Sequence, residues 1–389
     1  MINVAVVGTG AISSSHIEAY LAFPDRCRIV ALVDIDPERA ERQKAKYDLD
    51  AAVFGDYRRL LEGGVRLDVG VDLASVATPP GTHAEIEIGL LQGGVNVLGE
   101  KPMAASLEEC DAMTAAAESS GKLLSIVAQN RFRTPMMRLK RLLDAGLAGR
   151  VLHAQVDSYW WRGQRYYDLW WRGTWETEGG GPTLNHAVHH IDALQWMAGS
   201  PVEIQAMMAN TAHDNAEVED VSVAAMRFGS GAIGQLTSSV IHHGQDQQIV
   251  FQTERAKVAS PWDVYASTSR ANGFPDRNET LEHELTAYCD GLPPLVHEAH
   301  TGQIDDVLRV LETGRSPLID GHEGRKTIEI ITGIYASAIT RAPVSLPIGP
   351  ADPFYTKAGL LERAPHFYEK SASVTEFADN SITTTGRTT

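Results

Sequence analysis

The chain has 389 residues, 34 of them basic and 50 acidic, so its formal net charge is −16. This length predicts two domains, because a single hydrophobic core rarely grows beyond ~250–300 residues, and the negative charge argues against binding to nucleic-acid backbones or anionic membranes. No apolar run reaches the ~18–20 residues of a membrane span, the first residues lack a secretory signal, and the three cysteines form no Cys-x-x-Cys pair, so we expect a cytoplasmic protein without a disulfide or structural-zinc framework.

The first third of the chain alternates apolar runs with helical segments. Short runs rich in Val, Ile and Leu predict strands at residues 2–7, 29–33, 73–77, 95–98 and 123–127. Helices are predicted between them at residues 12–21, 37–46, 84–91 and 106–118. Ser106 and Glu109 form a candidate capping box at the start of the last helix. Repeated strand–helix alternation predicts a parallel sheet with helices on both faces.

After about residue 128 the rhythm changes to long runs with strand character. The predicted elements are helices at 135–143, 185–197 and 321–339, and strands at 151–158, 202–208, 221–228, 232–241, 248–253 and 344–348. Short turns such as Gly229-Ser230-Gly231 between successive strands predict an antiparallel sheet. From Gly349 onward Pro, Ser and Thr accumulate. The expected organisation is a dinucleotide-binding domain at 1–128, a substrate-binding and oligomerisation domain at 129–348, and a tail at 349–389.

A glycine-rich turn, Gly8-Thr9-Gly10-Ala11-Ile12-Ser13, follows the first predicted strand and opens a helix. The first glycine permits a tight turn, and the second lets the backbone approach a pyrophosphate that the helix N-terminus stabilises. At the end of the second strand, Asp34 can accept hydrogen bonds from a ribose 2′-hydroxyl and would repel a 2′-phosphate. We therefore expect NAD rather than NADP, although Arg39 lies nearby. The cofactor-binding residues predicted here are Gly8, Gly10, Ala11, Ile12 and Asp34.

Two further loops follow predicted strands at the carboxyl edge of this sheet, where ligands bind in such folds. The first is Thr78-Pro79-Pro80-Gly81-Thr82-His83, whose histidine either lines the cofactor crevice or is a capping or exposed residue. The second is Glu100-Lys101-Pro102, with a candidate cis peptide before the proline. Lys101 can polarise a substrate oxygen near the nicotinamide, and the alternative is a solvated surface lysine. We add Thr78, Pro79, His83, Glu100 and Lys101 to the cofactor-binding set.

The run from Gly179 to Asp192 combines glycines with amide, imidazole and carboxylate groups. Taken as a helix with ~100° per residue, it places Asn185, His189, Asp192 and Trp196 in one sector about 60° wide. A histidine with a near-neutral pKa can take an alcohol proton while hydride leaves the adjacent carbon. The alternatives are a structural polar helix and a metal site at His186 and His190. We expect no metal, because Ala187-Val188 stands where the zincin pattern requires a glutamate.

Five of the seven tryptophans lie within residues 159–175, here called the aromatic segment, together with tyrosines and arginines. Aromatic faces with interleaved polar donors suit a sugar, and an oligomer interface is an equal alternative. A basic pocket of Arg131, Arg162, Arg165 and Arg172 could bind a phosphorylated or nucleotide sugar. The predicted substrate-binding residues are Lys101, Arg131, Tyr159, Trp161, Arg162, Tyr167, Arg172, Asn185 and His189.

Together these motifs resemble the glucose–fructose oxidoreductase, inositol dehydrogenase and rhizopine catabolism (Gfo/Idh/MocA) family. The match includes residues 8–13 with His16, residues 100–102, the glycine-rich run to Asp192, and residues 321–325. The resemblance implies an N-terminal Rossmann domain and a C-terminal α/β domain with a large, mostly antiparallel sheet, whose open face commonly forms homodimers or homotetramers. By the family pattern, Lys101 and His189 match the catalytic lysine and histidine, and Asp192 the supporting acid.

Asn185 departs from the pattern, because many members have aspartate at this position. An amide can orient a hydroxyl but cannot relay a proton, so more of the acid–base work would fall on His189. The run 166–175 looks closest to members that oxidise C3 of sugars or nucleotide sugars.

The expected function is oxidation of a secondary hydroxyl of a sugar, sugar derivative or cyclitol by hydride transfer to NAD. In this reading Lys101 polarises the oxygen, His189 takes the proton, and Asn185 and Asp192 orient substrate and base. One alternative is an enzyme that oxidises a sugar transiently, eliminates or hydrolyses, and then reduces it back with the same NAD. The other is a non-catalytic dinucleotide-sensing regulator, against which the presence of Lys101 and His189 argues.

Overall fold

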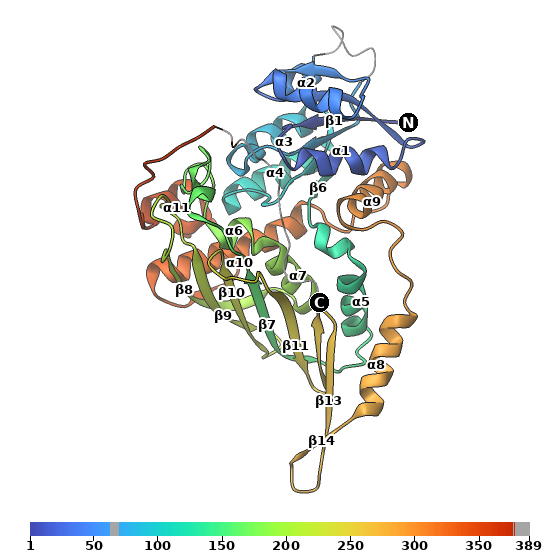
Figure 1. The fold of residues 1–389 in the computed structure, drawn as a ribbon, viewed down its shortest axis with the longest axis vertical. Coiled ribbons are helices and arrows are strands. Elements are labelled where there is room, and N and C mark those ends of the chain that lie inside the picture. Colours follow the sequence, from blue (N-terminus) through green and yellow to red (C-terminus); the bar gives the residue numbers. More distant parts are fainter. Residues whose placement is uncertain (63–69, 376, 378–389) are drawn as a thin grey trace.

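The computed structural model describes residues 1–62, 70–375 and 377. Its strands form two sheets, each covered by helices (Figure 1). The fold class is the predicted one, a parallel Rossmann sheet followed by an α/β unit built on a large, mostly antiparallel sheet. The Ser- and Thr-rich stretch 381–385 of the predicted tail lies outside the described residues. Within the described chain, no helix combines the length and apolar character that crossing a bilayer requires.

The first sheet has six parallel strands in the order β3-β2-β1-β4-β5-β6. They are β1 (Ile2–Val7), β2 (Cys27–Val33), β3 (Ala52–Phe54), β4 (Leu73–Val76), β5 (Asn96–Gly99) and β6 (Leu124–Ile126). Parallel neighbours need crossover connections, which use α1 (Ser13–Leu21), α2 (Pro37–Lys46), α3 (His83–Gln92) and α4 (Leu107–Ser120). The sequence pattern missed only β3, which has three half-buried residues at the sheet edge.

The predicted capping box at α4 forms in a shifted version. The Ser106 hydroxyl oxygen accepts a hydrogen bond from the Glu109 N–H at 3.2 Å. The Glu109 carboxylate accepts from the N–H of Ala105 at 3.1 Å, one residue before the position that a standard box would use. This cap fixes where α4 begins, directly after the loop that carries Lys101.

The second sheet has nine strands in the order β14-β13-β12-β11-β7-β10-β9-β8-β15. They are β7 (Val151–Tyr159), β8 (Pro201–Ala209), β9 (Val221–Phe228), β10 (Ile233–Ser239), β11 (Gln247–Thr253), β12 (Ala256–Ser260), β13 (Asp263–Ser269), β14 (Pro275–Arg277) and β15 (Val344–Ser345). Neighbours are antiparallel except β7 and β10. The predicted hairpin joins β9 to β10, with Gly231 at a φ of +88°. The sequence pattern missed β12 to β14, and Figure 1 shows β13 and β14 projecting from the body.

Helices cover one face of the second sheet and connect it to the first. They are α5 (Thr134–Asp144), α6 (Pro182–Asn185), α7 (Val188–Ala198), α8 (Glu279–Gly291), α9 (Ala299–Thr313), α10 (Gly321–Thr340) and α11 (Lys357–Arg363). The buried α10 contacts β8 and α7 on one side and α4 and β6 on the other, so it holds the two sheets together (Figure 1).

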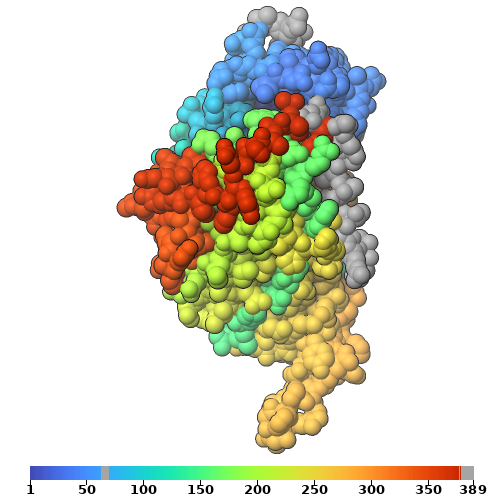
Figure 2. Space-filling model, turned by 60° about the vertical axis from the view of Figure 1, so that its left-hand side comes forward, coloured from blue at the N-terminus to red at the C-terminus, as the bar shows by residue number. Residues whose placement is uncertain are grey.

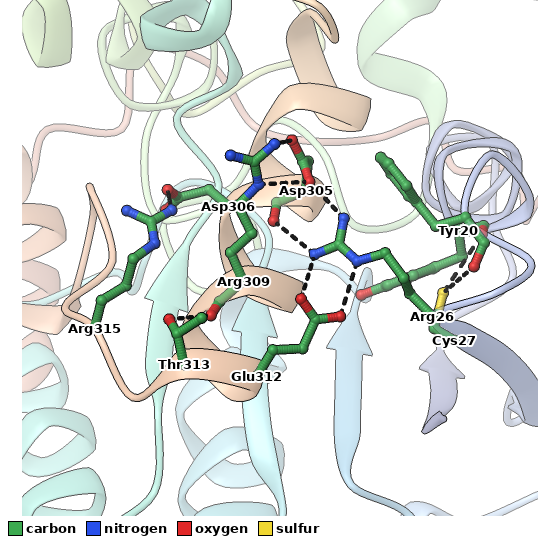
Figure 3. Close-up of polar contacts among 10 residues, drawn as sticks. Tyr20, Arg26, Cys27, Asp305, Asp306, Arg309, Glu312, Thr313 and Arg315 are labelled. Atoms are coloured by element: carbon green, nitrogen blue, oxygen red, sulfur yellow. Dashed lines mark hydrogen bonds and ion pairs between the residues drawn. The ribbon is translucent and has the colours of Figure 1, made fainter.

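The domain boundaries after residues 128 and 348 stay predictions, and α9 bears on them. Although α9 comes late in the chain, it packs against α1 of the first sheet. Arg26 pairs with Asp305 at 2.5 Å and with Glu312 at 2.8 Å, both on α9 (Figure 3). The late segment therefore returns to the dinucleotide-binding unit, and neither α8 nor α9 was predicted from the sequence.

Candidate active site

The glycine-rich turn between β1 and α1 lies at the carboxyl edge of the first sheet. Gly8 has a φ of +89°, and a Cβ there would lie 2.6 Å from the carbonyl oxygen of Ala77, so only glycine fits. A Cβ at Gly10 would meet no atom within 4 Å. Among the described residues, the N–H groups of Gly10, Ala11 and Ile12 have no hydrogen-bond partner, and α1 has no side-chain cap. Free N–H groups at a helix start fit an anion such as a pyrophosphate.

Asp34, at the end of β2, ties that strand to the glycine-rich turn. Its Oδ2 accepts hydrogen bonds from the N–H and the hydroxyl of Thr9, both at 2.8 Å. Its Oδ1 accepts from the Asp36 N–H at 3.0 Å and faces Arg39 at 3.4 Å. The carboxylate therefore lies where this fold reads the adenosine ribose, with a cation beside it.

Thr78 and Pro79 are partly exposed at the same sheet edge, whereas His83 is fully buried. The His83 ring contacts the carbonyl oxygens of Pro102 and Thr78, both at 2.9 Å. The prediction that His83 lines the cofactor crevice stays untested; in this structure the first turn of α3 faces its ring inward. The ring joins the two loops that carry Thr78 and Lys101.

Glu100 is buried and receives three hydrogen bonds. They come from His16 Nε2 at 2.8 Å, His300 Nε2 at 3.3 Å and the Lys101 N–H at 3.0 Å. Burial by itself raises the pKa of Glu100, but the two histidines outweigh it and hold the pKa well below its usual value. His16, Glu100 and His300 are also metal-ligand types, yet 2.8 Å is shorter than the ~3.3 Å between two ligands of a tetrahedral zinc. Hydrogen bonding accounts for the group.

Lys101 extends from the end of β5 toward the second sheet, and its peptide bond to Pro102 is cis, as the sequence suggested. Its Nζ donates to the carbonyl oxygen of Asn185 at 3.3 Å. Burial lowers the pKa of Lys101, Glu100 opposes the change, and the Arg172 charge adds to it. Lys101 is therefore not a solvated surface lysine; it spans the junction between the two units.

The predicted helix 185–197 is in fact two helices, α6 and α7, interrupted at His186 and Ala187. The Asn185 side chain donates to the carbonyl oxygens of Gly180 and Gly181 at 2.8 and 3.3 Å, which anchors it to the glycine run. The two histidines of the rejected metal alternative face different partners, since His190 contacts Ser158 at 3.0 Å and His186 lies near Tyr166.

His189, on the first turn of α7, lines a cavity together with Lys101 and Asp192. Burial lowers the pKa of His189 well below its usual value, and the nearby Lys101 charge adds to the effect. Within the described chain, its ring makes no hydrogen bond to another side chain or backbone group. The imidazole is therefore neutral at pH 7 and free to accept a proton from a ligand.

Asp192 is held by Arg131 rather than by His189. The Arg131 guanidinium donates to both oxygens of Asp192 at 2.9 and 2.8 Å, and also to Glu323 at 3.1 Å. The Arg131 side chain is only 1% exposed. The prediction that Arg131 binds substrate stays untested; in this structure each of its three guanidinium nitrogens donates to a protein acceptor. Arg131 fixes the carboxylate one turn beyond His189.

Stacked pairs organise the aromatic segment. Tyr159 stacks on His242 at 4.1 Å between ring centroids, and Trp161, which is 44% exposed, stacks on His243 at 5.4 Å. Arg172 lies over the ring of Trp171 at 4.0 Å and bonds to Glu178 at 2.9 Å. The segment thus offers an exposed flat face at Trp161, whereas Tyr159, Trp171 and Arg172 are half-buried.

Tyr167, predicted to bind substrate, is buried in this structure, and its role stays a prediction. Its neighbour Tyr166 faces the site instead, with its hydroxyl 3.4 Å from His186 Nε2 and Arg172 over its ring at 4.1 Å. Arg162 also lies over this ring, at 5.5 Å, whereas Arg165 is 86% exposed. The predicted basic pocket is reduced to Arg162 and Arg172.

Sequence reasoning missed Glu219, a fully buried carboxylate before β9. It accepts from the N–H groups of Gly181 and Thr183 at 3.0 and 3.1 Å and from the Tyr335 hydroxyl at 3.0 Å. Glu219 therefore holds the glycine run that carries Asn185. Its only sequence signal was an acidic pair directly before an apolar strand.

Two family models match this chain. The oxidoreductase family with an NAD-binding Rossmann fold (GFO_IDH_MocA) matches residues 2–128, and the GFO/IDH/MocA C-terminal domain matches residues 136–259.

Individual relatives are more distant. A 1-carboxy-3-chloro-3,4-dihydroxycyclohexa-1,5-diene dehydrogenase from Comamonas testosteroni is 31% identical over 63% of this chain and 60% of that protein. A 2,7-anhydro-N-acetylneuraminate hydratase from Mediterraneibacter gnavus is 28% identical over 81% of each chain. The structure is similar to that of the WlbA dehydrogenase from Bordetella pertussis in complex with NADH and UDP-GlcNAcA, with a TM-score of 0.75, 30% identity, and coverage of 90% of this chain and 99% of that one.

Proposed function

The chain belongs to the Gfo/Idh/MocA family of oxidoreductases, and we propose that it oxidises a secondary hydroxyl group of a sugar, sugar derivative or cyclitol with NAD. The observation that carries this proposal is the proximity of Lys101 and His189, which line one small cavity at the junction of the two units and are close enough for the Lys101 charge to lower the pKa of His189. An ammonium and a neutral imidazole facing one cavity are the groups needed to polarise an alcohol oxygen and remove its proton.

The glycine-rich turn and Asp34 would hold the dinucleotide, which supplies the hydride acceptor when bound. The free N–H groups at residues 10–12 fit its pyrophosphate, and the Asp34 carboxylate favours NAD over NADP by repelling a 2′-phosphate.

Each residue of the site has a distinct role in the proposed reaction. His189 accepts the hydroxyl proton, since burial keeps its ring unprotonated. Lys101 stabilises the oxygen as negative charge develops there. Asn185 presents an amide oxygen that can orient the hydroxyl but carries no proton. Asp192 lies on α7 and forms an ion pair with Arg131, and this ion pair positions the helix that carries His189.

The substrate class rests on the aromatic segment. Tyr159, Trp161 and Tyr166 offer flat faces for sugar C–H groups, and Arg162 and Arg172 offer donors for hydroxyl or phosphate oxygens. The relative that holds UDP-GlcNAcA makes a nucleotide sugar a reasonable first substrate to test.

A second function has one observation in its favour. The match to a 2,7-anhydro-N-acetylneuraminate hydratase covers 81% of both chains, so a reaction in which NAD is reduced and reoxidised within one turnover fits the same site. Such an enzyme releases no net NADH, whereas a dehydrogenase does.

We also propose a homodimer or homotetramer formed through the open face of the second sheet. This face carries exposed apolar side chains that a monomer leaves in water: Met207, Val223 and Ile233.

The test is NADH formation with NAD or NADP and a panel of free sugars, inositols, sugar phosphates and nucleotide sugars. We expect signal with one class and with NAD. His189→Ala should lower kcat by about 10²–10⁴-fold and leave the Kd for NAD within about twofold, because a general base contributes to turnover only. His283→Ala, an exposed histidine on α8, is the matched control. Equal losses of turnover and NAD affinity in His189→Ala would contradict the role.

A further inference from the structure

Beyond α11 the chain turns back in extended form, and residues 364–375, here called the strap, lie along the aromatic segment. Figure 2 shows this end of the chain, in red, crossing the green surface. The N–H of Val374 donates to the carbonyl oxygen of Asp168 at 2.7 Å, and the N–H of Trp170 donates to that of Val374 at 2.9 Å. These two bonds form a parallel bridge between Leu169 and Val374. The backbone carbonyl of Asp168 and the N–H of Trp170, both in the aromatic segment, are therefore hydrogen-bonded to the strap.

A buried asparagine, Asn215, clamps strap and aromatic segment together. Its Oδ1 accepts from the N–H groups of Ser371 and Ala372 at 2.8 and 2.9 Å. Its Nδ2 donates to the Ala372 carbonyl oxygen and to Asp168 Oδ1, both at 3.0 Å. One amide thus satisfies groups on two segments that are about 200 positions apart in the sequence.

Two further contacts extend the attachment to both ends of residues 167–175. Lys370 Nζ donates to the carbonyl oxygens of Tyr167 and Leu169. Trp175 Nε1 donates to the carbonyl oxygen of Pro365 at 2.8 Å, and the Trp175 ring is buried. The strap thus contacts backbone or side-chain groups of residues 167–170 and 175.

The opposite side of the same stretch faces the candidate site. Tyr166, one residue before the first strap contact, approaches His186 at 3.4 Å. Arg172 lies over the rings of Tyr166 and Trp171, and its positive charge helps to lower the pKa of Lys101. A shift of residues 167–170 would therefore move the side chains that we assign to the sugar.

We propose that the strap, through Asn215 and Lys370, is the positioning element that holds the aromatic segment in its sugar-binding geometry without touching the sugar. The inference rests on the proposed function, because it assigns the segment to that substrate. It predicts that loss of the strap contacts lowers the affinity for the sugar. The affinity for the cofactor, which binds at the first sheet, should not change.

The test compares chains that end at Arg363, which lack the strap, with chains that end at Thr375, which keep it. Asn215→Ala breaks the clamp without truncation, so it applies even where the shorter chain fails to fold. Its matched control is Asn272→Ala, an exposed asparagine in the β13–β14 turn. The readouts are the KM for the best sugar of the panel, the Kd for NAD, and hydrogen exchange of the Trp170 amide.

For Asn215→Ala and the shorter truncation, we expect the sugar KM and the Trp170 exchange rate each to rise roughly tenfold or more, the factor implied by losing one buried hydrogen bond. The NAD Kd and both controls should stay unchanged. Unchanged exchange, or faster exchange with an unchanged KM, would overturn the proposal. If the intact chain oxidises no sugar, the proposed function fails, and Trp170 exchange by itself then decides whether the strap positions the segment.

Discussion

Glu219 offers a direct test of how burial shapes this site. Three hydrogen bonds, from Gly181, Thr183 and Tyr335, favour its ionised form. Burial opposes them and is the larger effect, so the pKa of Glu219 is raised from 4.5 to about 7. The folded protein therefore binds a proton at this position that the unfolded chain releases at lower pH.

The consequence for stability follows from linkage. Because the folded-state pKa is raised, the stabilising contribution of this group is complete below pH 4.5 and is lost as the pH rises through about 7. At ~1.36 kcal/mol per pKa unit, the free energy of unfolding should fall by about 2–3 kcal/mol between pH 5 and pH 8 on account of Glu219.

Glu219→Gln isolates this contribution. The amide does not titrate, although its nitrogen, unlike the second oxygen of the carboxyl group, cannot accept the hydrogen bond from the Gly181 N–H. Urea unfolding followed by circular dichroism should show the stability of the variant, relative to that of the wild type, rising by about 2–3 kcal/mol from pH 5 to pH 8. Glu284→Gln, an exposed carboxylate on α8, is the control. A stability difference between Glu219→Gln and the wild type that does not change from pH 5 to pH 8 would refute the reasoning.

Three further changes test other parts of the site. Arg131→Met should lower the free energy of unfolding by about 3–5 kcal/mol, because it leaves the Asp192 carboxylate buried without its partner; urea unfolding measures it. Asp34→Ser should raise the ratio of NADP to NAD efficiency by roughly tenfold or more, since the repulsion of a 2′-phosphate is removed; steady-state kinetics with both cofactors decide. Gly181→Ala should abolish most activity and lower the melting temperature, because a Cβ would lie 1.9 Å from the carbonyl oxygen of Glu219; a variant as stable and active as wild type would contradict the geometry.

The sequence predicted the bounds of helices and strands well where a short stretch of chain shows the pattern of its buried residues. The bounds of β1, α2 and β9 match the sequence expectation at both ends, since a continuous apolar run marks a strand buried on both faces, as in β1, and alternation marks one buried on a single face, as in β9. Strands β12 to β14 and helices α8 and α9 were missed. The strand β14, for example, is a short, fully exposed Pro-Asp-Arg run that becomes a strand only by pairing with β13.

Side-chain roles divide in the same way. Gly8 and Lys101 were identified from motifs, because the turn geometry and the sheet edge are local properties. The burial of His83, Arg131 and Tyr167, which were predicted as ligand contacts, was not foreseen, since the elements that bury them come from elsewhere in the chain.

The sequence by itself determined the fold class and the chemical groups available: a glycine-rich turn with an acidic residue after the second strand, a lysine at a sheet edge, and a histidine on a helix. Only the tertiary structure decided which of these groups share a cavity and in what protonation state. Lys101 reaches Asn185 across 84 positions, and Arg131 holds Asp192 across 61. The physical reason is that burial and neighbouring charges, which set exposure and pKa, come from segments that are close only after folding.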